Sequence, residues 1–173
     1  MLRFLTLILL SLLISGCGII NDFVVIESSD SGSSETEFTS DEPPQLNLLL
    51  DEPVAMDTGT YCWTSAEVGI CVDMMPPIYE ADNHIAVSGE SLTLQFVSTP
   101  PTSVSAYVHP GSNLMTRIAD IPLEATLNDD GSVSIPLVAQ LDGDYVLVVI
   151  GLWQGDSPTG DAMYILPIRV TNQ

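Results

Sequence analysis

The amino-acid sequence predicts an all-β fold class, an antiparallel sandwich of two β-sheets built from short strands. Apolar and polar residues alternate in the runs Leu92 to Phe96 and Val104 to Val108, a period of two that is typical of half-buried strands. The dipeptides Asp130-Gly131 and Asp142-Gly143 mark turns between such runs. Because no window of a dozen residues carries a helical stripe, we expect residues 51–173 to form one β domain. A small closed barrel is the alternative.

The first residues have the layout of an export signal. A single cation, Arg3, precedes a predominantly apolar run from Phe4 to Ile14, shorter than the roughly 20 apolar residues that span a bilayer. The run ends in Ile14-Ser15-Gly16-Cys17, which resembles a bacterial lipobox. We therefore predict a signal peptide over 1–16 and a lipidated Cys17. The alternatives are a plain secretory signal and an uncleaved anchor helix extended through Ile20.

The lipobox resemblance implies a membrane anchor. In that class the cysteine sulfur receives a diacylglyceryl group, and a fatty acid such as palmitate usually acylates the new amino terminus. Two or three acyl chains hold a protein stably on a membrane, whereas one chain holds it only marginally. We expect the mature lipoprotein on the extracytoplasmic face of the cell membrane. Gly18 in place of an aspartate favours the outer membrane if the cell has one.

Residues 17–50 are predicted to form an acidic, disordered tether. Between Glu27 and Gln45 the chain is rich in Ser, Glu and Asp and cannot bury enough apolar surface to offset its ordering entropy. The whole chain of 173 residues has a formal net charge of −20 and no lysine. Nucleic acid is therefore excluded as a partner, because binding phosphates requires clustered cations. Anionic lipid is disfavoured for the same reason.

The last third refines the fold class to an immunoglobulin-like β-sandwich. The run from Leu141 to Trp153 is a long predicted strand that is entered through a turn. Tyr145 stands two residues after Gly143, where immunoglobulin-like domains carry a "tyrosine corner" near the start of strand F. A final strand from Ala162 to Val170 is expected to pair with this long strand.

The two cysteines other than Cys17 are Cys62 and Cys71. A disulfide is the default for a close cysteine pair in an exported chain, because nothing outside the cytoplasm keeps thiols reduced. The CxxC spacing of redox motifs and zinc knuckles is missing. A hairpin that turns near Glu67 to Gly69 would place the two sulfurs opposite each other. We predict a disulfide, with metal or redox use as the alternatives.

The cysteine segment also resembles a known group of proteins. GTYCW, followed by CVD and Pro76-Pro77, is similar to a family of small secreted or lipid-anchored bacterial proteins with a G-[ST]-Y-C-W…C-x-D…P motif. The similarity continues in SGESLTLQF, from Ser88 to Phe96, and in the terminal strands around Gly143-Asp144-Tyr145 and GDAMY. The resemblance implies a secreted all-β domain. It implies no particular activity, substrate or cofactor.

No strong catalytic or metal motif occurs in the sequence. G-x-S-x-G is absent, and the only histidines, His84 and His109, stand in loop-like segments. With Asp82 they would form a small metal site if the loops met, but the usual ligand spacing is missing. Asp129-Asp130 and Asp142-x-Asp144 are expected to form turns, with calcium binding as the alternative. We predict no catalytic residue, no metal and no cofactor.

The leading prediction is a non-enzymatic binding or structural module whose partner is an envelope protein. Trp63 is expected in the core beside the disulfide, as in immunoglobulin domains. Trp153 ends a long strand, where a partly exposed aromatic residue would contact a partner. Loops at one end of the sandwich would supply the other contacts. The candidate contact residues are Trp153, Asp156, Ser157, Pro158 and His109.

Two other function classes stay open. One is an immunoglobulin-like protease inhibitor that presents the Pro100-Pro101 loop or the loop of Asp156 to Pro158. The other is a metal-dependent hydrolase that uses His84 and His109.

Overall fold

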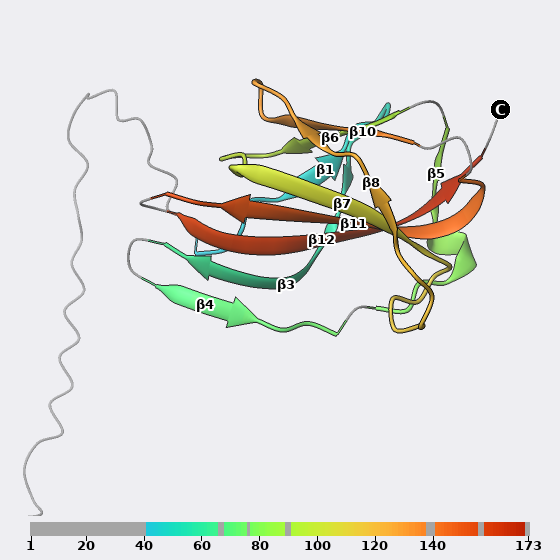
Figure 1. Ribbon diagram of the computed structural model, residues 1–173, viewed down its shortest axis with the longest axis horizontal. Coiled ribbons are helices and arrows are strands. Elements are labelled where there is room, and N and C mark those ends of the chain that lie inside the picture. The colour runs from blue at the N-terminus through green and yellow to red at the C-terminus, as the bar shows by residue number, and fades with distance from the viewer. Residues whose placement is uncertain are drawn as a thin grey trace, which may run out of the picture. The chain divides into compact units, whose positions relative to one another are not determined.

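The computed structural model describes residues 41–65, 68–75, 77–88, 91–137, 141–155 and 158–171 (Figure 1). The predicted signal peptide, Cys17 and the predicted tether up to residue 40 lie outside these ranges. The helix η1 (Ala81–Asn83) is a single 3-10 turn. No helix in the described ranges is long and apolar enough to cross a membrane.

The described chain forms two β-sheets that pack on each other, as the sequence predicts (Figure 1). The small sheet has the strand order β2-β1-β6-β10-β9, and the large sheet has the order β4-β3-β12-β11-β7-β8, with β5 paired to β12 off this path. The small sheet contains β1 (Leu46–Leu48), β2 (Val54–Ala55), β6 (Ser91–Phe96), β9 (Thr126–Leu127) and β10 (Ser132–Pro136). The large sheet contains β3 (Asp57–Thr64), β4 (Gly69–Val72), β5 (Ile85–Val87), β7 (Ser103–Pro110), β8 (Ile121–Leu123), β11 (Gly143–Trp153) and β12 (Thr159–Val170).

The strand order is that of an immunoglobulin-like sandwich. β1-β6-β10-β9 correspond to strands A-B-E-D, and β12-β11-β7-β8 correspond to G-F-C-C′. The strand pairs are antiparallel, except that β5 runs parallel to β12. The hairpin of β3 and β4 is inserted between the A strand and β5, and it extends the large sheet beyond β12. The two sheets are separate, so the alternative prediction of a closed barrel is wrong.

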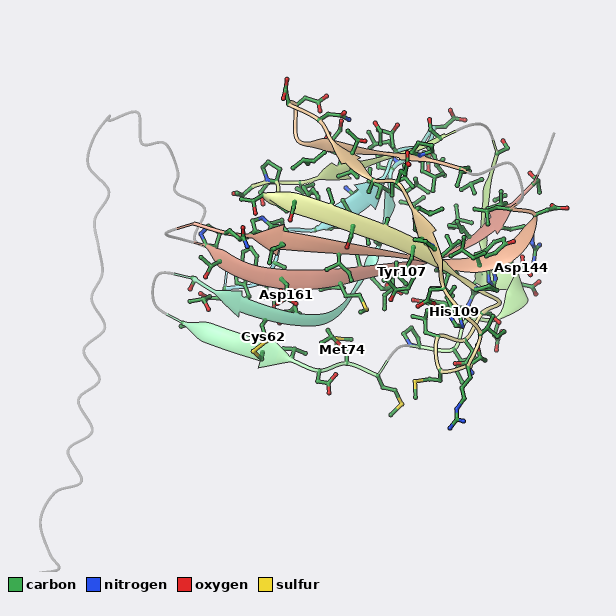
Figure 2. The ribbon with its side chains drawn as sticks, in the orientation of Figure 1. Cys62, Met74, Tyr107, His109, Asp144 and Asp161 are labelled. Carbon is green, nitrogen blue, oxygen red and sulfur yellow. A yellow bond between two sulfur atoms is a disulfide. The ribbon has the colours of Figure 1, made fainter. Side chains whose placement is uncertain are left out.

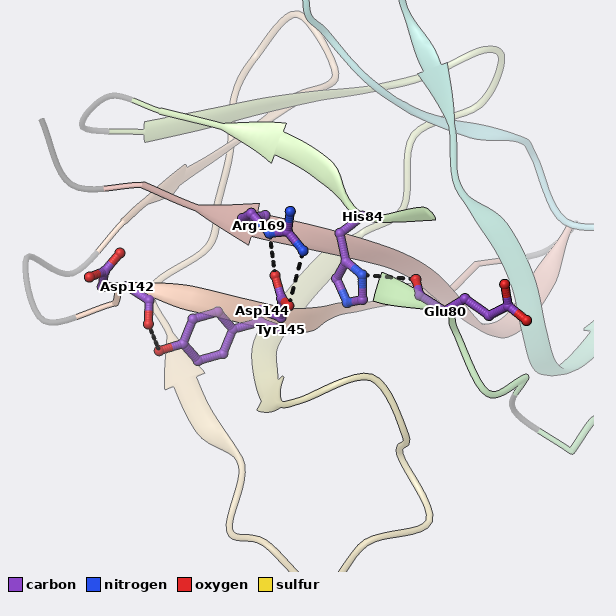
Figure 3. A network of polar contacts seen from close by, with 6 residues as sticks. All are labelled: Glu80, His84, Asp142, Asp144, Tyr145 and Arg169. Carbon is purple, nitrogen blue, oxygen red and sulfur yellow. Dashed lines mark hydrogen bonds and ion pairs between the residues drawn. The ribbon is translucent and has the colours of Figure 1, made fainter. Parts of the chain in front are cut away.

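The predicted tyrosine corner is present at the start of β11. The hydroxyl of Tyr145 donates a hydrogen bond of 3.4 Å to the main-chain carbonyl of Asp142 (Figure 3). Gly143 lies between them with φ at +116°, a conformation that side chains other than glycine rarely adopt. The turn before Gly131 is also as expected, because both the N–H and the hydroxyl of Ser132 donate to the Asp130 carboxylate.

Aromatic side chains fill one end of the space between the sheets. The Trp153 ring packs edge to face on Trp63, with centroids 5.0 Å apart, and on Phe96, with centroids 5.6 Å apart. Phe96 packs in the same way on Tyr164 at 5.7 Å. Such edge-to-face pairs add stability beyond the burial of apolar area. A side chain at Gly151 would collide with the Trp153 ring, so this tryptophan depends on a glycine two residues before it on the same strand.

The domain begins earlier in the sequence than predicted. Leu46 and Leu48 of β1 are completely buried, and the Tyr164 hydroxyl donates a 2.6 Å hydrogen bond to the Pro44 carbonyl. The expectation that the tether of residues 17–50 precedes a domain of 51–173 is therefore wrong for its last residues. A three-residue strand has too few residues to show a period of two, so the sequence pattern does not reveal β1.

Candidate functional site: a methionine-lined groove on the large sheet

The disulfide between Cys62 and Cys71 is confirmed. The two residues are direct partners on β3 and β4, with Cα atoms 4.1 Å apart. Both cysteines are exposed on the outer face of the large sheet, the face that points away from the small sheet. Trp63 points to the opposite face, because side chains alternate along a strand. Trp63 therefore packs on Trp153 in the core, and the expected packing of Trp63 against the disulfide is wrong.

The outer face of the large sheet carries a second apolar cluster. Val146 and Val148 of β11 and Ile165 of β12 are buried there, and half-buried residues pack against them. These surrounding residues are Tyr79, Tyr107, Leu114, Ile150 and Met163. A sheet face that is apolar in this way must be covered, and in this chain loops supply the cover instead of a third sheet.

Two loops lie over this outer face: residues 73–80, described except for residue 76, and residues 111–120. They are joined by an isolated antiparallel bridge between Ile78 and Asn113 and by a 3.0 Å hydrogen bond from the Tyr79 N–H to the Ser112 carbonyl. Tyr79 from the first loop and Leu114 from the second contact the apolar cluster of the sheet. The two loops therefore brace each other on the strands beneath them.

A groove of about 330 Å³ opens where the first loop leaves β4. We call it the methionine groove, and its lining residues are Asp57, Thr58, Gly59, Met74, Met75, Pro77 and Ile165. Gly59 contributes to the open space, since a Cβ at this position would stand 3.0 Å from the end of the Ile165 side chain. The volume falls in the range of pockets that hold small molecules or single side chains of a partner.

The groove is apolar and open to solvent. Met75 is 81% exposed and Met74 is 45% exposed. Ile78, three residues further along the same loop, is 71% exposed. Methionine side chains are unbranched and polarizable, so they adapt to differently shaped partners. Clustered exposed apolar residues of this kind mark interaction sites more often than single exposed ones do.

One polar pair stands at the end of the groove. The Tyr79 hydroxyl donates a 3.0 Å hydrogen bond to a carboxylate oxygen of Asp57. Burial, together with this hydrogen bond and the negative charge of Asp57, raises the pKa of the Tyr79 hydroxyl above its usual value of 10.0. Tyr79 therefore remains a neutral hydrogen-bond donor at physiological pH, and it holds the loop of residues 73–80 against β3.

His109 is not in a surface loop, as the sequence suggested, but on β7, and it is only 2% exposed. Its Nδ1 lies 2.7 Å from the Asp120 carboxylate, and its Nε2 lies 2.7 Å from the Thr116 hydroxyl. An ionised carboxylate only accepts hydrogen bonds, so Nδ1 carries the proton. In the neutral ring, Nε2 then accepts from Thr116. His109 is too deeply buried to contact a partner directly, so the prediction that it is a contact residue is wrong.

The other histidine belongs to a separate polar network, drawn in Figure 3. His84 Nδ1 lies 3.2 Å from the Glu80 carbonyl. Arg169 donates from Nε and Nη2 to the two carboxylate oxygens of Asp144, at 2.6 and 3.2 Å. The hydrogen bond from Arg169 lowers the pKa of Asp144 below its usual range. No group of three or more potential metal-ligating side chains occurs in the part of the chain that the structure describes.

Another residue that was predicted to contact a partner at the end of the sandwich, Trp153, is also buried. Trp153 is 3% exposed and its indole N–H donates a 3.1 Å hydrogen bond to the Thr99 carbonyl, so the expected exposed contact at this residue is wrong. Pro158 is half-buried, and Asp156 and Ser157 lie outside the described residues. The sequence signal for the groove was the pair Met74-Met75 before two prolines, in a segment without helical or strand periodicity.

Three comparisons with known proteins give no relative on which to base a function. No protein-family model matches the chain, and neither the curated proteins nor the solved structures contain a significant match.

Proposed function

We propose that the chain is a lipid-anchored extracytoplasmic lipoprotein that acts as a non-enzymatic binding module. Its anchor is the acylated Cys17, and its partner is another protein of the cell envelope, bound at the methionine groove. The observation that carries the proposal is the groove itself: an apolar space of about 330 Å³, bordered by Met75 at 81% exposure, on the rigid outer face of a sheet. Preformed, largely apolar concavities with few polar groups are the usual form of binding sites.

The sheet face is a better candidate than the loops at the end of the sandwich. Trp153 and His109 are both buried and engaged in hydrogen bonds within the domain. Pro101, in the loop that a protease inhibitor would present, is buried as well. By contrast, Met74, Met75 and Ile78 expose large apolar surfaces next to one another in the sequence.

Site-specific photo-crosslinking in the native cells tests this proposal. A photoreactive phenylalanine analogue placed at Met75 should give discrete adducts with an envelope protein. The same analogue at Val97, which is 62% exposed next to β6 of the small sheet, is the matched control and should give none. Met74→Asp should abolish the Met75 adducts while the protein stays folded. Adducts that form equally at both positions, or at neither, would remove the groove as the binding site.

The anchor has a test of its own. Cys17→Ala should move the protein from the membrane fraction to the soluble fraction, because the acyl chains would no longer be attached. If the mutant stays with the membranes, lipidation at this residue is wrong. In cells with two membranes, we expect the wild-type protein in the outer membrane fraction.

A second candidate, ester hydrolysis, is favoured by one observation. Asp120, His109 and Thr116 have the order and the spacing of an acid, an imidazole base and a nucleophilic hydroxyl. The Thr116 oxygen would attack the ester carbonyl as His109 takes its proton; the alcohol would leave with that proton, and water would then release the acid. The same hydrogen bonds also have a structural role, because they attach residues 111–120 to β7 through the buried His109. The binding module therefore remains the first proposal.

The hydrolase candidate is tested with p-nitrophenyl esters of short acids. Any turnover should disappear in Thr116→Val and persist in Thr102→Val, a threonine whose hydroxyl bonds to the Leu152 carbonyl elsewhere in the domain. Absence of turnover by the wild-type protein, or equal turnover by all three, would eliminate this candidate.

A further inference from the structure

Strand β4 forms an open edge of the large sheet. Its one partner among the described strands is β3, and Figure 1 shows no strand on its other side in that part of the chain. The Ser65 N–H donates a 2.9 Å hydrogen bond to the Val68 carbonyl, which identifies this pair as hydrogen-bonded. Because hydrogen-bonded and non-hydrogen-bonded pairs alternate, Gly69 and Cys71 occupy non-hydrogen-bonded positions. Their N–H and C=O groups therefore point away from β3, toward the open edge.

The disulfide holds this edge in place. β4 has four residues and pairs with one neighbour, so it would fray easily on its own. The bond from Cys71 to Cys62 ties β4 to the much longer β3, as the yellow bond in Figure 2 shows. Edge strands that must avoid pairing usually carry a charge or a proline, and Gly69–Val72 contains neither. A pinned, uncharged edge is suited to accept another strand.

The surroundings of the edge indicate the chemistry of that strand. Beyond Val72 the chain continues into the exposed methionines of the groove. Exposed carboxylates stand nearby: Asp73 follows β4 directly and accepts from Thr60, and Asp57 lines the groove. The whole chain has a formal net charge of −20 and no lysine, so a second copy would be repelled and a cationic partner attracted.

We propose that β4 and the methionine groove together bind an extended segment of a partner protein, which adds to β4 as a further strand. In this segment every second side chain faces the outer side of the sheet, and these side chains are apolar or are those of Lys or Arg. The backbone pairs with Gly69 and Cys71, an apolar side chain enters the groove, and the cations face Asp73 and Asp57. This proposal rests on the proposed binding function and specifies the partner. Main-chain hydrogen bonds give affinity in such strand addition, and alternate side chains give specificity.

Three synthetic octapeptides test the proposal on the mature, lipid-anchored chain in detergent micelles, with isothermal titration calorimetry. The first, the Val/Lys peptide, has the sequence Lys-Thr-Val-Thr-Lys-Thr-Val-Thr, so that Lys and Val share one face and Thr occupies the other. The second replaces each Lys by Glu, and the third is the first with alternate backbone amides N-methylated. The Val/Lys peptide should bind, and the other two should bind at least about tenfold more weakly, through loss of charge attraction or of backbone hydrogen bonds. Amide hydrogen exchange at Gly69 and Cys71 should slow when the first peptide is bound.

The substitution Gly69→Pro tests the role of the β4 backbone in binding. It removes an N–H that points away from β3, so it should weaken binding at least about tenfold without lowering the melting temperature. Val97→Asp on the small sheet is the control and should leave binding unchanged. Equal binding of the N-methylated peptide, equal binding of the Glu peptide, or no binding of any peptide would each overturn the proposal. So would a homodimer that Gly69→Pro dissociates, because the occupant would then be a second copy.

Crosslinking separates this proposal from the broader one. Adducts at Met75 without protection of Gly69 and Cys71 would leave the binding module intact and remove the strand addition. Absence of adducts at Met75 would remove the binding site itself.

Discussion

The two faces of the large sheet are built from the same strands but behave differently. The inner face carries Trp63, Trp153 and Tyr164, which the small sheet covers completely. The outer face carries the cluster around Val148 and Ile165, which loops cover only in part. Alternation along β3, β11 and β12 therefore separates the two faces: one is fully covered and stabilises the fold, and the other remains partly open to solvent.

Truncation of β1, a strand of the small sheet that covers the inner face, gives the largest expected effect. Removal of residues 27–40 should leave the melting temperature nearly unchanged, whereas removal of residues 27–48 should abolish cooperative unfolding or lower the melting temperature strongly. The second deletion takes the buried Leu46 and Leu48, and each large buried side chain contributes about 2–5 kcal/mol. Differential scanning calorimetry of both variants measures this. Equal melting temperatures would show that β1 is dispensable as a cover of the inner face.

A pair of single substitutions compares the faces directly. Trp153→Ala should lower the free energy of unfolding by about 3–5 kcal/mol, because it removes a buried ring with two aromatic neighbours. Met75→Ala should change it by less than about 0.5 kcal/mol, since the side chain is 81% exposed. Urea denaturation followed by circular dichroism measures both values. Losses of similar size would contradict the division between the two faces.

The disulfide lies on the outer face and should have an intermediate effect. Cys62→Ser with Cys71→Ser should lower the free energy of unfolding by about 2–3 kcal/mol, because the bond closes a loop with a sequence separation of 9 residues. Guanidinium denaturation measures the loss, and intact-mass analysis of the wild-type protein should show two fewer hydrogens. Two free thiols in the exported protein would contradict the bond.

The smallest expected effect concerns the Tyr79–Asp57 pair at the groove. The pKa of Tyr79 is raised in the folded state, so its contribution to stability is complete below pH 10.0, the ordinary tyrosine value, and is lost as the pH rises above it. Tyr79→Phe should therefore make the free energy of unfolding fall less steeply above pH 10.0. Tyr145→Phe is the control substitution. An identical pH profile for Tyr79→Phe and the wild-type protein would show that the Tyr79 hydroxyl is not held by the fold.

Much of the sandwich could be predicted from local patterns. The period of two in β6 and β7, the turns before Gly131 and Gly143, and the tyrosine corner are properties of a few neighbouring residues. The cysteine pair was predictable as well, because its spacing and the predicted export leave few other uses for it. The groove was not, since it forms only where the loop of residues 73–80 crosses strands that lie far from it in the sequence.

The sequence by itself determined the fold class, the pairing of Cys62 with Cys71 and the strong negative charge, because short-range periodicity, spacing and composition carry that information. Tertiary structure alone decided which apolar residues are covered. It buried His109 and Trp153 and left Met75 exposed, although all three stand near turns or strand ends in the sequence. Burial depends on which distant segment packs above a residue, and no local pattern specifies that neighbour.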